Sequence, residues 1–74
     1  MRLKREGVIS GVPDLFLAVP KLHYGGLWIE LKNGKDGRIT PSQKIMHKEL
    51  ECSYMVKVVR SFDEFKYVIN NYLR

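Results

Sequence analysis

The order of apolar and polar positions along the chain predicts two short strands, a helix, a third strand and a final helix. Residues 12–18 and 26–32 are apolar runs of strand length, and Pro20, Gly25 and Gly26 mark a turn between them. Residues 54–59 form a third run, rich in β-branched side chains. Residues 33–38 are polar and predict a loop before the first helix.

Capping signals predict where the helices begin. Thr40 is a typical N-cap, with Pro41 at the first helical position and Gln43 at the third, and this helix should run to about residue 51. The pattern Ser61-x-x-Glu64 predicts a capping box for the last helix. We expect its apolar stripe to consist of Phe62, Phe65, Ile69 and Tyr72.

The predicted order is therefore β-β-α-β-α, after a short N-terminal helix remnant over residues 2–6 that stops at Gly7. A right-handed crossover through the helix should make the strands at 26–32 and 54–59 parallel. The sequence predicts an α/β fold in which a mixed sheet is flanked by helices.

The 74 residues predict a single domain, 1–74, with a core small enough that a second subunit would add needed stability. Cys52 is the only cysteine, which excludes an intrachain disulfide and favours a reducing, cytoplasmic location. We expect its side chain to pack as a small apolar group. The sequence holds no apolar block that predicts a signal peptide or membrane span. A net charge of +5 favours nucleic acid as a partner.

A hairpin folded about Leu22 would place three charged side chains together. In that register Asp14 faces Glu30, and directly opposed residues share one face of a sheet. Lys32 lies two residues beyond Glu30 and points to the same side. The other face would be apolar, with Leu15, Leu17, Leu27, Ile29 and Leu31.

Two opposed carboxylates repel each other, so they predict a compensating cation. Mg²⁺ or Mn²⁺ fits, because such ions bind through one or two carboxylates together with water and phosphate oxygens. The metal would activate water and polarise a phosphoryl group, and Lys32 would stabilise the charge that develops. The plainer alternative is that Glu30 and Lys32 form an ordinary surface ion pair and Asp14 belongs to a turn after Pro13.

Three ordered motifs resemble the VRR-NUC family of PD-(D/E)XK nucleases. They are Gly11-Val12-Pro13-Asp14-Leu15, Trp28-Ile29-Glu30-Leu31-Lys32 and Thr40-Pro41-Ser42-Gln43. The resemblance covers residues 2 to 73 and implies a minimal restriction-endonuclease-like fold. It further implies that Asp14, Glu30 and the backbone carbonyl of Leu31 bind the metal, that Lys32 is the catalytic lysine, and that Gln43 belongs to the active site.

The resemblance also implies structure-selective DNA cleavage by a homodimer, similar to a Holliday-junction resolvase, in the cytoplasm of a bacterial or phage-infected cell. Family members carry an upstream helix with a glutamate and a further strand, which we expect this chain to lack. Lys35, Arg38 and Lys44 are candidates for phosphate contacts, or else solvated surface residues. We interpret His47 as a packing residue on the helix stripe of Gln43, Met46 and Leu50.

Two functions from other classes stay open. One is a DNA-binding module that keeps the nuclease fold without catalysis. The other is a subunit or fragment whose fold exists only in a larger assembly.

Overall fold

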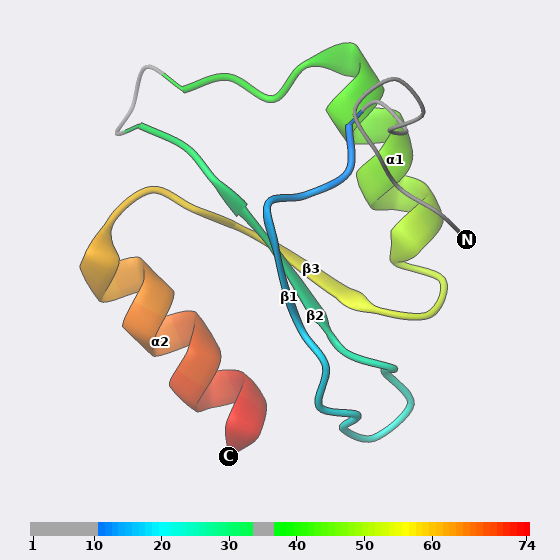
Figure 1. Cartoon of the computed structure of the whole chain (residues 1–74), viewed down its shortest axis with the longest axis vertical. Helices are drawn as coiled ribbons and strands as arrows, with labels where there is room; N and C mark the ends of the chain where they lie inside the picture. The colour runs from blue at the N-terminus through cyan, green and yellow to red at the C-terminus, as the bar shows by residue number, and fades with distance from the viewer. Residues whose placement is uncertain (1–10, 34–36) are drawn as a thin grey trace.

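The computed structural model describes residues 11–33 and 37–74 (Figure 1). The elements follow the predicted order: β1 (Leu15–Leu17), β2 (Leu27–Leu31), α1 (Pro41–Leu50), β3 (Met55–Val59) and α2 (Phe62–Leu73). The predicted α/β class with a mixed sheet is confirmed, although each strand is shorter than its apolar run. The helix remnant predicted at residues 2–6 and its stop at Gly7 lie outside the described residues.

The described residues form a three-stranded sheet in the order β1-β2-β3, with β2 in the middle. β1 pairs with β2 in antiparallel orientation, and Leu15 lies opposite Ile29 and Leu17 opposite Leu27. These pairs have the register that the fold about Leu22 predicted. β2 and β3 are parallel, as the crossover through α1 predicted.

The turn between β1 and β2 is tight at its tip. Lys21 and Tyr24 form an antiparallel bridge, and Leu22 between them has a positive φ of 54°. Its side chain is 93% exposed, so the leucine contributes no packing that offsets this conformation.

The two helices lie on opposite sides of the sheet (Figure 1). The core forms between the sheet and α2, where Leu27 and Ile29 of β2, Val59 of β3 and Tyr72 of α2 are buried. Leu15 and Leu31, predicted for the same apolar face, are 42% and 46% exposed because they lie beyond this core. The side facing α1 carries an aromatic pair, Phe16 and Trp28, with ring centroids 4.6 Å apart.

Helix α1 begins as the capping signals predicted. The hydroxyl of Thr40 accepts a hydrogen bond from the backbone N–H of Gln43, and the Gln43 side chain accepts one from the backbone N–H of Thr40. The predicted inward stripe of α1 is half-buried, at Gln43, Met46, His47 and Leu50. The helix thereby places Gln43 and His47 over β2.

Helix α2 begins at the predicted residue with a modified cap. Ser61 Oγ accepts a hydrogen bond from the N–H of Glu64, but the Glu64 carboxylate accepts from Arg60 N–H, one residue before the N-cap. No helix among the described residues has the length and apolar character needed to cross a bilayer.

Two packing predictions are wrong. Phe62 is 70% exposed, because it lies in the first turn of α2 beyond the sheet, and Val68 takes the inward position instead. Phe62 contacts Phe65 and lies under the ammonium group of Lys66. Cys52 is exposed, because α1 has already ended when the chain turns toward β3.

Candidate active site

The carboxylate of Glu30 is the centre of a polar cluster at the end of β2. Glu30 is only 3% exposed, although it is charged. Lys32 Nζ lies 3.7 Å from Glu30 Oε2, and this confirms that the two side chains point to the same side of the strand. A buried carboxylate needs such partners, because removing an unpaired charge from water costs at least several kcal/mol.

Gln43 connects the lysine and the glutamate. Its Nε2 donates to Glu30 Oε2 at 3.1 Å, and its Oε1 accepts from Lys32 Nζ at 2.8 Å. The same Oε1 accepts from the backbone N–H of Thr40 at 3.0 Å. Gln43 thus completes the capping box of α1 and also belongs to the cluster.

Asp14 reaches the cluster from the residue before β1. Its Oδ2 accepts a hydrogen bond from the backbone N–H of Leu31 at 2.8 Å, which holds the carboxylate against the edge of β2. The negative charge of Asp14 also raises the pKa of Glu30. The structure therefore brings Asp14, Glu30, Lys32 and Gln43 together, as the hairpin register and the motif order predicted.

The pKa of Glu30 is raised above its ordinary value of 4.5. Burial is the main cause, and the nearby charge of Asp14 is the next. The hydrogen bond with His47 and the charge of Lys32 act in the opposite direction but are the weaker influences. The protein environment alone therefore disfavours the ionised form of Glu30.

His47 belongs to this cluster, which sequence reasoning missed. Its Nε2 lies 3.3 Å from Glu30 Oε1, and its side chain is 12% exposed. The signal was present in the spacing, because His47 lies one helical turn after Gln43 and faces the same strand. The interpretation of His47 as packing alone is therefore too narrow.

Gly11 explains how the first motif approaches the third. It has a positive φ of 87°, and a Cβ built on it would clash with the carbonyl oxygen of Ser42. Only glycine permits this contact, which ties the segment leading to Asp14 to the N-terminal turn of α1. The glycine thereby sets the position of Asp14 relative to Gln43.

A divalent cation fits the chemistry of Asp14 and Glu30. Burial and then the charge of Asp14 raise the pKa of Glu30, and a cation would offset that charge and favour the ionised form of Glu30. The described residues contain no group of three or more His, Cys, Asp or Glu side chains able to hold a metal. The remaining ligands would therefore be water, backbone or phosphate oxygens, which is the coordination that Mg²⁺ prefers.

Two of the predicted phosphate contacts, Arg38 and Lys44, are exposed, and the third, Lys35, lies outside the described residues. The loop that carries Arg38 is fixed at its base, where Arg60 Nη1 donates to the carbonyl of Gly37 at 2.6 Å.

Comparisons with known proteins agree with the motifs. A solved structure described as "VRR_NUC domain protein" superposes with a TM-score of 0.83 and is 33% identical in sequence. The match covers 92% of this chain, which in turn spans 57% of the length of that protein. No protein-family model and no curated protein matches the sequence.

Proposed function

This chain belongs to the VRR-NUC family, as its three motifs predicted, and on that premise we propose that it hydrolyses DNA phosphodiester bonds with Mg²⁺ or Mn²⁺. Its similarity to a VRR_NUC protein identifies a nuclease-like domain. The metal, the residues that act and the DNA structures that are cut are parts of our proposal.

The observation that carries the proposal is the buried Glu30 carboxylate between a lysine and a second carboxylate. An ordinary surface ion pair, the plainer alternative, would leave Glu30 solvated, but this side chain is 3% exposed. Burying a carboxylate beside Asp14 opposes folding. Such destabilised charges are typical of functional sites, where a ligand compensates them.

Each side chain has a role that follows from its contacts. Asp14 and Glu30 would hold the cation, with the carbonyl of Leu31, and the bound metal supplies an activated water and a polarised phosphoryl oxygen. Gln43 and His47 fix the two oxygens of Glu30, so that the carboxylate does not rotate. Gln43 also directs the Lys32 ammonium group, which would stabilise negative charge on the phosphate as the bond breaks.

We further propose that the substrate is branched DNA and that two copies of the chain act together. The exposed Arg38 and Lys44 would contact phosphates, which positions a backbone without reading its sequence. A groove of about 330 Å³ between the sheet and the start of α2 is lined by partly exposed apolar side chains, among them Leu15, Leu31 and Phe62. A second copy would cover them, and paired sites suit paired cuts in a junction.

One observation favours the alternative of a non-catalytic DNA-binding module. Asp14 Oδ2 accepts from Leu31, and both oxygens of Glu30 contact protein groups, namely Gln43 and His47. Each carboxylate thus has hydrogen-bond partners within the protein itself. A module would keep the DNA affinity of the basic surface and show no cleavage.

Cleavage under single-turnover conditions distinguishes the two functions. Labelled four-way junction, flap and linear duplex are incubated with the protein in Mg²⁺, Mn²⁺ or EDTA. We expect metal-dependent cutting that falls at least about a hundredfold in Asp14→Ala and Lys32→Ala. Asp63→Ala is the matched control, because Asp63 is an exposed carboxylate on α2, away from the cluster. Binding without cutting in every metal would establish the module instead.

A further inference from the structure

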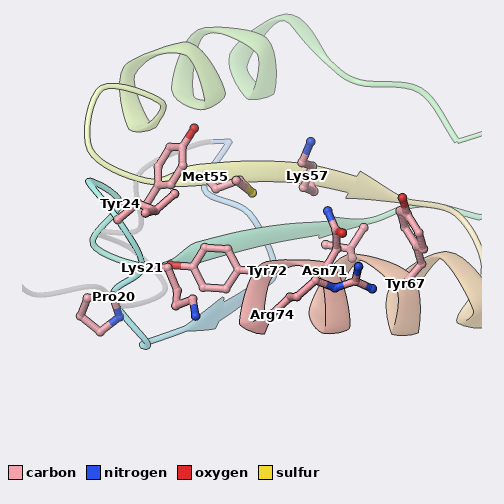
Figure 2. A pocket seen from close by; sticks show the side chains of 11 residues that line it. Pro20, Lys21, Tyr24, Met55, Lys57, Tyr67, Asn71, Tyr72 and Arg74 are labelled. Atoms are coloured by element: carbon pink, nitrogen blue, oxygen red, sulfur yellow. The ribbon is translucent and has the colours of Figure 1, made fainter.

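A second hollow lies at the opposite end of the sheet from the Glu30 cluster. It has a volume of about 440 Å³ and lies between the β1–β2 turn, β3 and the end of α2 (Figure 2). None of the cluster residues lines it. Its wall contains Lys21, Tyr24, Lys57, Tyr67, Asn71 and Arg74. The volume is within the usual range for a small-molecule site, roughly 300–1,000 Å³.

Helix α2 and the residue that follows it contribute three side chains to this cavity. Tyr67 and Asn71 lie four residues apart on one side of the helix, and Arg74 is its C-cap residue. Tyr67 is 68% exposed, which leaves one large aromatic ring open to a ligand. Tyr72, in contrast, is buried, and its hydroxyl donates to the carbonyl of Val19, so this side chain forms part of the cavity wall.

The charge of the cavity is positive. Lys21, Lys57 and Arg74 line it, and among the described lining residues none is acidic. The ammonium group of Lys21 already has a partner in the protein, because its Nζ donates to the carbonyl of Leu73 at 3.2 Å. The acidic residues of α2, Asp63 and Glu64, lie in its first turn, at the other end of the helix. Lys57 on β3 and Arg74 at the C-cap of α2 therefore make the cavity suited to an anion.

An exposed aromatic ring beside two basic side chains is the combination that binds single-stranded nucleic acid. Bases stack on the ring whatever their sequence, and the cations contact the phosphates. The amide of Asn71 can donate to and accept from a base edge. An acidic peptide would use the charges but would leave the ring of Tyr67 without a flat partner. The chemistry of the cavity thus favours a nucleotide.

We propose that this cavity binds an unpaired DNA strand, with a base on Tyr67 and phosphates at Lys57 and Arg74. The inference rests on the proposed function, because it names a second contact to the same DNA. Lys57 and the cavity are on the α2 side of the sheet, whereas Glu30 faces α1. A strand held here does not enter the active site, so the cavity selects substrates that carry an unpaired strand beside the cut.

Fluorescence anisotropy in EDTA tests the binding separately from cleavage. The probe is a labelled single-stranded oligothymidylate of about eight nucleotides, a length within the usual site size. We expect Tyr67→Ala to weaken binding at least about fivefold, since one stacked base is lost. Lys57→Glu should also weaken binding and should reduce the salt dependence of the affinity, because a phosphate contact is lost. An abasic probe should bind the unmodified protein as weakly as the thymidylate probe binds Tyr67→Ala.

Two variants outside the cavity serve as controls. Ile45→Ala on α1 truncates a large side chain that is similarly exposed, at 63%, and Lys66→Glu on α2 makes the same charge change as Lys57→Glu. Both should bind the probe as the unmodified protein does. Equal losses in a control and its cavity counterpart, or no loss in either cavity variant, would overturn the inference.

If the cavity variants lose binding while no metal supports cleavage, the inference stands and the proposed nuclease function fails. If cleavage occurs and the cavity variants bind normally, only the inference fails.

Discussion

Replacing Glu30 by glutamine should make the protein more stable at neutral pH. The substitution keeps the size of the side chain and removes a charge that is 3% exposed and adjacent to the charge of Asp14. Lys32 and His47 favour that charge, but burial and Asp14 outweigh them, since the pKa of Glu30 is raised. We expect Glu30→Gln to raise the free energy of unfolding by about 1 kcal/mol, a usual gain when strain at a functional site is relieved. For a domain of this length that is roughly 4–8 °C in Tm.

The gain should depend on pH in a defined direction. Folded protein keeps a proton on Glu30 at pH values where the unfolded chain has lost it. The free energy of unfolding therefore falls as pH rises from the ordinary value of 4.5 through the raised pKa of Glu30. The variant lacks this fall, so the two proteins should be equally stable below pH 4.5 and diverge above it. Urea denaturation across this pH range measures the difference. A variant less stable than the parent at neutral pH, or a difference that does not change with pH, would show that burial and Asp14 do not destabilise the charge of Glu30.

Three other predictions concern the elements that position the site, and each is measured by chemical denaturation. Leu27→Ala should lower the free energy of unfolding by about 2–5 kcal/mol, because Leu27 is fully buried. Leu22→Ala at the exposed turn should change it by less than about 0.5 kcal/mol, and equal effects of the two substitutions would contradict the described core. Gly11→Ala should lower the free energy of unfolding by about 2 kcal/mol or more, because the backbone has a positive φ there and the new Cβ would meet the Ser42 carbonyl. An unchanged stability would count against that contact. Thr40→Ala should lose about 1 kcal/mol through the missing N-cap, and Thr40→Ser should restore it.

The parts of the structure that sequence predicted are those set by local chemistry or by counting along strands. The cap at Thr40 depends on side chains within one turn, so it was readable from the sequence. The hairpin register followed because side chains alternate strictly and the turn about Leu22 fixes the pairing, which placed Asp14 beside the strand of Glu30. The convergence of Asp14, Glu30 and Lys32 therefore needed no knowledge of the packed helices.

The parts that sequence missed depend on where an element ends relative to the sheet. Phe62 has the spacing of an inward residue, but the first turn of α2 extends past the core. Cys52 follows α1 and points to solvent for a similar reason. His47 was recognised as facing the sheet, but only the packed distance between α1 and β2 brings its ring to the Glu30 carboxylate. Such distances are a tertiary property and are not encoded in periodicity.

Calorimetric titration with Mn²⁺ in the absence of DNA measures whether Asp14 and Glu30 share one cation. We expect saturable binding to the parent protein, a loss of at least about tenfold in affinity for Asp14→Asn, and unchanged binding for Asp63→Asn, whose side chain is 94% exposed on α2. No binding to the parent, or equal affinity in all three proteins, would contradict it.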